Sequence, residues 1–298
     1  MLLGYSNNYK PAMARLLIRM VKVSFITFTK NSAHRLKGLL EHVKDVVDEI
    51  IVVDGYSTDE TLDIAKSYGA KVYQRKPWGY PDPDRMFALK RASYDWILML
   101  DDDERLCNML RNSLREIIES CQQRDFVAID LLRVNLSRNG KVIPAPYFPD
   151  RVLKIFRKDR VVFTGRVHEG PKVFGPTYHL SSKYYLIHLP YHENNWVKKA
   201  VGYAYYQSIQ YSSIIGGNMF RRALLRLLPL TTIPYYLYLM SALIKRNFPV
   251  NSLSLKYCFR RALCDGVLQT LMNFRNNKRK RLAEKISKNG FSQFLGIE

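Results

Sequence analysis

The sequence is poor in cysteine, in acidic residues and in long apolar runs, and each shortage excludes a class of protein. Its 298 residues include four cysteines, which form no C-x-x-C pair and show no metal-ligand spacing with histidine. A disulfide scaffold and a structural zinc site are therefore excluded, and we expect free thiols in a reducing cytosol. No G-x-G-x-x-G follows the first predicted strand, which argues against a nicotinamide-dependent dehydrogenase. The helical H-E-x-x-H motif of zincins is absent as well.

Acidic residues are few beside the basic ones. Lys and Arg number 47 against 26 Asp and Glu, which gives a formal net charge of +21. Such a surplus indicates a polyanionic partner: nucleic acid, an acidic membrane surface or phosphorylated substrates. Residues 196–298 hold 17 basic and three acidic residues, so about two thirds of the excess charge lies in the last third of the chain.

Long apolar runs are almost missing. Residues 227–244 carry no charge but include Pro229 and Pro234, and 18 residues is the lower limit for spanning a bilayer. Basic residues flank this stretch on both sides, which favours a segment lying in the cytoplasmic interface. An apolar helical stripe follows, and the alternative of an ordinary core-facing helix stays open for it: Leu255, Phe259, Leu263, Val267, Leu271 and Phe274. The basic run at residues 278–281 suits anionic lipid head groups.

The N-terminal segment is basic and weakly apolar. Its apolar patch at residues 14–20 is interrupted by Arg15 and Arg19, so we predict no secretion signal there. Residues 1–20 are interpreted as a basic amphipathic lead-in.

The stretch around which the chain is organised is WILMLDDDE, residues 96–104. The apolar run at residues 96–100 is typical of a strand buried on both faces of a parallel sheet. Four acids follow it directly, and carboxylates gathered at a strand end usually hold a cation. A solvated loop that caps the next helix is the alternative. Ligands of open α/β sheets bind beyond the carboxyl ends of the strands, which favours a site.

Strands and helices are predicted to alternate through the first hundred residues. Strands are expected at residues 21–29, 49–53, 70–74 and 96–100, with helices between them. Asn31 or Ser32 would cap the first helix, Ser57 and Glu60 would form a capping box for the second, and residues 85–93 would form the third. This order predicts an α/β fold with a doubly wound, mostly parallel sheet. Residues 126–135 and 141–162 then look antiparallel, with a turn at Asn139 and Gly140.

Three strings, IIVVDGYSTDET, YPDPDRMFALKRA and WILMLDDDE, resemble the family 2 glycosyltransferases of the GT-A fold in order and spacing. The resemblance covers roughly residues 21–196. It is strongest to membrane-associated members, such as lipopolysaccharide-core glucosyltransferases and archaeal mannosyltransferases of lipid-linked glycans. One departure is Gly55, where many relatives have a second Asp.

The resemblance implies a site for a nucleotide-diphosphate sugar and a divalent cation. The family's D-x-D matches Asp101, Asp102 and Asp103. Asp103 would hold Mg²⁺ or Mn²⁺ against the diphosphate, and Asp101 would reach the ribose or the ion, because oxygen ligands suit these hard cations.

Further residues would complete the donor site. Asp54 matches the acid that hydrogen-bonds the base or ribose in the family, although a simple turn residue is the alternative. Thr27 of the first strand and Arg75 after the third would flank the same base. Arg85 would face the diphosphate, with a solvated helix arginine as the alternative.

An inverting transfer needs a base that deprotonates the acceptor hydroxyl. The best candidate is Glu169 in the stretch GRVHEG, with His168 as an orienting group or a neighbour of the metal. A plain loop pair is the alternative. His188, in the stretch LIHLPYHEN, is a candidate metal ligand. The alternative is a structural role, which is common for two histidines four residues apart after a strand.

These observations predict three regions: the lead-in (1–20), a GT-A catalytic domain (21–195) and a helical membrane-associated region (196–298). The expected function is an inverting hexosyltransferase at the cytoplasmic face of the cell membrane, acting on a lipid-linked acceptor. GDP-mannose is favoured as the donor over UDP-glucose. A basic nucleic-acid-binding protein is the alternative of another class, and the aliphatic stripe in the basic region argues against it.

Overall fold

The structure is a computed structural model that describes most of the chain up to residue 189. The described residues are 21–78, 80–137, 139–143, 150–166 and 170–189, with 201–202, 204–206, 209, 255, 258, 262 and 281 beyond them. The lead-in and the uncharged stretch at 227–244 lie outside the described residues, as does the apolar stripe apart from Leu255. Within the described ranges, no helix combines the length and apolar character needed to cross a bilayer.

The first half alternates strands with helices, as the sequence predicts. The elements in chain order are β1 (Val23–Thr29), α1 (Ala33–Val43), β2 (Glu49–Asp54), α2 (Thr61–Ser67), β3 (Lys71–Gln74), α3 (Asp82–Leu89) and β4 (Trp96–Met99). These four strands pair in parallel in the spatial order β3-β2-β1-β4. Their carboxyl ends therefore share one edge of the sheet.

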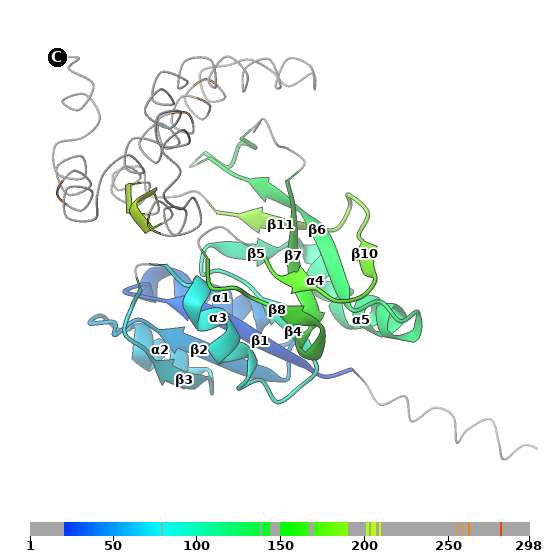
Figure 1. Ribbon diagram of the computed structural model, residues 1–298, viewed down its shortest axis with the longest axis horizontal. Coiled ribbons are helices and arrows are strands. Elements are labelled where there is room, and N and C mark those ends of the chain that lie inside the picture. Colours follow the sequence, from blue (N-terminus) through cyan, green and yellow to red (C-terminus); the bar gives the residue numbers. More distant parts are fainter. Residues whose placement is uncertain are drawn as a thin grey trace, which may run out of the picture.

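The second half extends the same sheet with mostly antiparallel strands. Its elements are β5 (Glu104–Leu106), α4 (Asn108–Asn112), α5 (Leu114–Gln123), β6 (Ala128–Asn135), β7 (Asp150–Arg157), a 3₁₀ turn (Lys158–Arg160), β8 (Val161–Val162), β9 (Lys172–Val173), β10 (Thr177–His179) and β11 (Tyr185–His188). Strand β7 pairs antiparallel with both β4 and β6, and the path continues through β11 to β5. Figure 1 shows β7, β6 and β11 rising past the end of the parallel strands. The expected mixed α/β fold is confirmed.

Helices cover both faces of the parallel strands because alternate side chains point to opposite sides. On β4, Trp96 and Leu98 face the core that contains α1 and α5, whereas Ile97 and Met99 face the core that contains α3. The same alternation holds on β1, where Phe25 and Ile26 enter different cores. The sheet is thus fixed from both sides, and its edge is a rigid base for a site.

The N-termini of the first three helices differ from the sequence prediction. No capping box forms at α2, because Ser57 donates its amide and its hydroxyl to the Asp54 carboxylate, and Glu60 sits at the N-cap without a side-chain bond. Ser32 is the N-cap residue of α1 but makes no capping bond. Helix α3 begins at Asp82 and ends at Leu89, earlier than expected at both ends, since a proline in its first turn fits a helix start.

The described cysteines agree with the prediction of free thiols. Cys107, Cys121 and Cys258 are free and buried. Burial raises the pKa of the Cys121 thiol to about 11, with Arg124 opposing the shift, so this thiol is protonated at neutral pH.

A buried carboxylate ties the four parallel strands together at the edge opposite their carboxyl ends. Glu49, at the start of β2, accepts hydrogen bonds from Ser24 on β1, from Lys71 on β3, and from both the amide and the hydroxyl of Ser93 before β4. Burial opposes the ionisation of Glu49, but these donors outweigh it and lower its pKa from 4.5 to about 2. The ionised form is therefore favoured in the folded state.

We expect Glu49→Gln to lower the thermal unfolding midpoint at pH 7 by about 4–8 °C, since charge-assisted hydrogen bonds contribute roughly 2 kcal/mol. The folded-state pKa is depressed, so this contribution is present above the unfolded pKa of 4.5 and is lost as the pH falls toward 2. Calorimetry between pH 2 and pH 7 measures it, and the midpoint difference should shrink steadily as the pH falls below 4.5. Glu60→Gln, at an exposed residue, is the matched control. A midpoint difference that stays constant with pH would contradict the assignment.

Candidate active site

One large cavity opens at the edge where the parallel strands end. Its volume is about 1270 Å³. The charged side chains that line it come from both halves of the sheet and from α1 and α3: Lys30, Arg35, Asp54, Arg75, Asp82, Asp84, Arg85, Asp101, Asp102, Asp103, Asp130, Arg133, Arg151 and Lys154. The wall carries both basic and acidic groups, so the cavity suits a ligand that is polar and ionised.

Asp54, at the end of β2, is held in one orientation. The residue is fully buried, and its carboxylate accepts hydrogen bonds from the Ser57 amide at 2.9 Å, from the Ser57 hydroxyl and from Gln74 at 3.3 Å. The turn that follows places Tyr56 at a φ of +56°, in the left-handed region. Asp54 lines the cavity, as predicted, and the turn pre-orients its carboxylate.

Thr27 does not reach the cavity. It lies inside β1, fully buried, and its hydroxyl finds no hydrogen-bond partner among the described residues. Thr29, at the end of the same strand, lines the cavity. The placement expected of Thr27 therefore belongs to Thr29, because β1 continues for two residues beyond Thr27.

Arg75 and Arg85 both line the cavity, and each is paired with an acid of α3. The Nε of Arg75 lies 2.6 Å from Asp84, and its guanidinium covers the Phe87 ring at 4.1 Å. The Nε of Arg85 lies 3.2 Å from Asp82, and its Nη2 lies 3.6 Å from Asp101. Burial alone would lower the pKa of Arg85. The negative charges of Asp101 and Asp82 outweigh burial and raise this pKa above its usual value, so the guanidinium stays charged.

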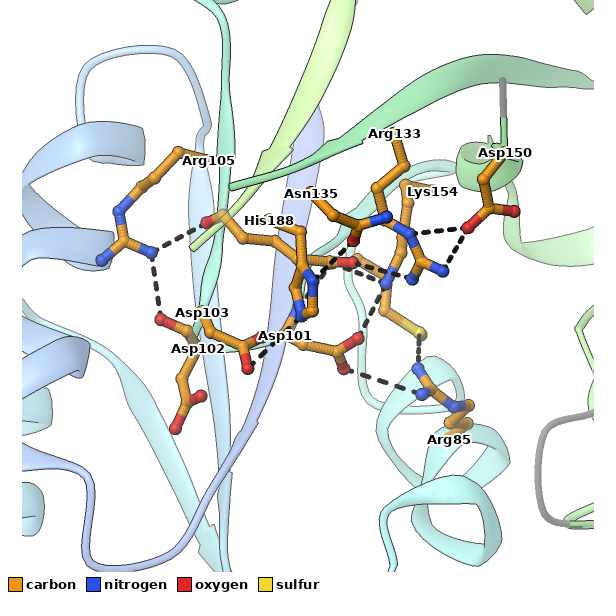
Figure 2. A network of polar contacts seen from close by, with 12 residues as sticks. Arg85, Asp101, Asp102, Asp103, Arg105, Arg133, Asn135, Asp150, Lys154 and His188 are labelled. Atoms are coloured by element: carbon orange, nitrogen blue, oxygen red, sulfur yellow. Dashed lines mark hydrogen bonds and ion pairs between the residues drawn. The ribbon is translucent and has the colours of Figure 1, made fainter. Parts of the chain in front are cut away.

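Asp101 is engaged by two cations. Its Oδ2 lies 2.9 Å from Lys154 Nζ, while its Oδ1 lies 3.6 Å from Arg85 (Figure 2). Burial opposes ionisation of Asp101, but Lys154 and Arg85 hold its pKa well below the usual range. Both carboxylate oxygens of Asp101 thus face positive charges.

Lys154 also holds Glu104. The Lys154 ammonium lies 2.6 Å from Glu104 Oε2, which in turn accepts the Asp101 amide at 3.0 Å. Glu104 Oε1 is buried without a hydrogen bond, and Arg133 lies 3.8 Å from it. Burial raises the pKa of Glu104, with Lys154 opposing the shift. Burial lowers the pKa of Lys154, but Asp101 and Glu104 raise it above its usual value.

The remaining two acids of the motif point in different directions. The Asp102 carboxylate lies 3.2 Å from Arg35 of α1, and in Figure 2 it points away from His188. Burial raises the pKa of Asp102, and the positive charge of Arg35 opposes this shift. Asp103 faces His188, with 3.6 Å between Oδ2 and Nε2. His188 Nδ1 lies 2.8 Å from Asn135 Oδ1, so the amide orients the ring.

The positions of Asp103 and His188 follow from the strand register. His188 of β11 pairs with Asn135 of β6 on one side and with Glu104 of β5 on the other. The Leu189 amide then donates to the Asp103 carbonyl at 2.7 Å. Two backbone neighbours thus fix the imidazole beside the carboxylate.

Asp103 and His188 form a pair of donors that fits a divalent cation. A carboxylate oxygen and an oriented imidazole nitrogen, 3.6 Å apart, can approach one ion together. Across the described ranges, no group of three or more His, Cys, Asp or Glu side chains is arranged to hold a metal. The predicted catalytic pair His168 and Glu169 lies outside the described residues.

Sequence reasoning missed the basic wall of the site. Lys154 on β7 and Arg133 on β6 line the cavity, as do Arg151 and its partner Asp130, which also lies 2.9 Å from His179. The signal was the stretch RVLKIF, in which a lysine interrupts the apolar alternation of a strand. A charged residue between buried neighbours needs a partner of opposite charge.

Comparisons with known proteins agree with this geometry. Residues 24–165 match the family described as glycosyl transferase family 2. An uncharacterised glycosyltransferase of Rickettsia felis is 34% identical over 173 residues, which cover 56% of this chain and 60% of that protein. The lipopolysaccharide core biosynthesis glycosyltransferase LpsC of Rhizobium meliloti is 30% identical over 133 residues, covering 41% of this chain and 47% of LpsC.

Solved structures are more distant. The crystal structure of S. aureus TarS 1–349 in complex with UDP is 18% identical, with a TM-score of 0.44 over 85% of this chain and 90% of that one. The matches also leave much of the curated relatives uncovered. The chain spans 60% and 52% of the length of the glycosyltransferases of Rickettsia felis and Rickettsia bellii.

The fold and the site define a GT-A-like α/β domain with an acidic motif at the end of a central strand. Over residues 24–165 the chain is similar to glycosyl transferase family 2.

Proposed function

We propose that this chain is an inverting, metal-dependent glycosyltransferase that moves a hexose from a nucleotide-diphosphate sugar to a lipid-linked acceptor. The observation that carries the proposal is the meeting of the D-x-D stretch, Asp54 and Arg85 in one cavity of a family 2 domain. These groups come from the ends of β2 and β4 and from α3, so they surround one ligand from three sides.

Each part of the donor has a matching group. The fixed carboxylate of Asp54 can accept hydrogen bonds from the base or the ribose, because Ser57 and Gln74 orient it. Arg75 lines the same end of the cavity. Arg85 presents a charged guanidinium near Asp101, where it can pair with the diphosphate.

The metal would be held by Asp103 and His188, which fit it by geometry and by donor type. When bound, a divalent cation supplies Lewis-acid stabilisation of the charge on the leaving diphosphate. Glu169 is proposed to take the proton of the acceptor hydroxyl as that hydroxyl attacks the anomeric carbon. The described residues on both sides of this loop, Phe163 and Gly170, line the cavity, which supports the proposal.

GDP-mannose is the favoured donor, and UDP-glucose is the alternative. A panel of nucleotide sugars, with and without Mn²⁺, tests the class, the donor and the metal together. At a hundredfold excess over its Kd, the correct donor should raise the unfolding midpoint by about 5–10 °C, and by less without Mn²⁺. No shift with any nucleotide sugar, together with a salt-sensitive shift by DNA, would replace the proposal with a nucleic-acid-binding function.

The lipid-linked acceptor and the cytoplasmic membrane face are further parts of the proposal. They are supported by the similarity to LpsC, a lipopolysaccharide core biosynthesis glycosyltransferase, and by the basic, apolar sequence of residues 196–298. Recovery of the full chain as a soluble monomer in detergent-free, low-salt buffer would contradict both.

A further inference from the structure

We propose that Lys154 is a positioning residue that keeps Asp101 out of the coordination sphere of the metal, so that the cation is held by Asp103 and His188. The inference rests on the proposed function. It adds a residue of β7 to a site that the D-x-D motif alone would place entirely after β4.

Lys154 places a largely buried positive charge beside the acids of the site. Its side chain comes from β7, the strand that pairs antiparallel with β4, and the acids of the site follow β4. The residue is 8% exposed, and its ammonium lies 2.9 Å from Asp101 Oδ2 and 2.6 Å from Glu104 Oε2. Figure 2 shows the Lys154 ammonium directed at Asp101.

The charges around Asp101 are balanced without a metal. Lys154 holds its Oδ2, and Arg85 faces its Oδ1 at 3.6 Å. A divalent cation placed on either oxygen would come close to the largely buried positive charge of Lys154 or Arg85, and like charges repel. Displacing Lys154 would also strip Glu104 of its hydrogen-bonded cation. Asp101 is therefore better suited to accept a hydrogen bond from a donor hydroxyl.

Asp103 has a different environment. Its Oδ2 faces His188 Nε2 at 3.6 Å, and Asn135 Oδ1 accepts the proton of His188 Nδ1, which leaves the Nε2 lone pair directed at the same space. An imidazole lone pair and a carboxylate oxygen attract a cation together. The two ends of the motif thus have separate tasks, and Lys154 is the residue that separates them.

Two protein ligands leave most positions of an octahedral ion to water and to the diphosphate. The metal and the donor should therefore bind together, each raising the affinity of the other by the same factor. The same reasoning predicts weak binding of Mn²⁺ alone, which can be measured without any sugar transfer.

The test compares Mn²⁺ affinity in the absence of nucleotide, by titration calorimetry on the full chain. Lys154→Met alone would leave two buried carboxylates without their cation and endanger the fold, so it is combined with Glu104→Gln, which keeps the charge balanced. We expect this double variant to bind Mn²⁺ about tenfold more tightly than the wild type, because Asp101 becomes a second carboxylate ligand. Adding Asp101→Asn should return the affinity to the wild-type value.

Lys158→Met is the matched control. This lysine directly follows the C-terminal end of β7, and it donates hydrogen bonds to the Ala92 and Ser93 carbonyls instead of to the acids of the site. It should leave Mn²⁺ affinity unchanged. An unchanged affinity in the double variant, or a gain that survives Asp101→Asn, would overturn the inference. A failure of the nucleotide-sugar panel would instead reject the proposed function, and the Mn²⁺ comparison between variants would still be readable.

Discussion

Replacing Asp103 by Asn should remove the metal-dependent part of donor binding. The metal is expected to contribute several kcal/mol through the charge of the diphosphate, so the affinity for the nucleotide sugar in the presence of Mn²⁺ should fall by at least about two orders of magnitude. Asparagine keeps the shape of a residue that is 7% exposed, so packing is preserved. Calorimetric titration of donor into each protein, with Mn²⁺ and with a chelator, measures the effect.

Asp102→Asn is the matched control, because the Asp102 carboxylate points toward Arg35 and away from His188. Its donor affinity should stay within about fivefold of the wild type, which corresponds to roughly 1 kcal/mol. With the chelator present, wild type and Asp103→Asn should bind the donor alike. Equal Mn²⁺-dependent affinity in wild type and Asp103→Asn would show that the metal is held elsewhere.

The second large effect is expected at Glu169. Glu169→Gln removes the proposed base while keeping a side chain of the same size, so turnover should fall by about two to four orders of magnitude. Donor affinity should remain within a few-fold, because the base acts on the acceptor. Single-turnover kinetics at saturating donor separate the two quantities.

Near wild-type turnover in Glu169→Gln would move the role of base to another acid. Asp150 is the described alternative, but it is bound to Arg133 by two hydrogen bonds from the guanidinium. These bonds hold the Asp150 carboxylate against Arg133, so it is less free to turn toward an acceptor hydroxyl. Asp150→Asn is therefore expected to alter turnover less than Glu169→Gln.

The parallel half of the fold could be predicted because its signals are local. The apolar runs of β2 and β4 specify strands buried on both faces, and the acids that follow mark the edge where the site forms. The acidic stretch was located in this way, whereas Asp54, Arg75 and Arg85 were indicated by the resemblance to family 2 glycosyltransferases, and all of these residues line the cavity.

What the sequence could not reveal depends on contacts between distant residues. The partners of Lys154 lie about fifty positions earlier in the chain, and nothing in the stretch RVLKIF indicates which acids it meets. The spacing of Ser57 and Glu60 predicts a capping box, but in the structure the Ser57 hydroxyl donates a hydrogen bond to Asp54 instead. Local sequence patterns predict helices and strands. Which of several possible partners a polar side chain binds depends on residues that come together only when the chain folds.

The position of Lys154 on β7 also has a consequence for the order of synthesis. Asp101 and Lys154 are 53 residues apart, so at roughly 5–20 residues per second the acids leave the ribosome about 3–10 seconds before their cation. During that interval Asp101 can meet Arg85 but not Lys154, and Glu104 lacks the Lys154 ammonium. The buried ion pairs form when β7 adds beside β4, so completing the sheet and balancing the charge of the site are a single late event in folding.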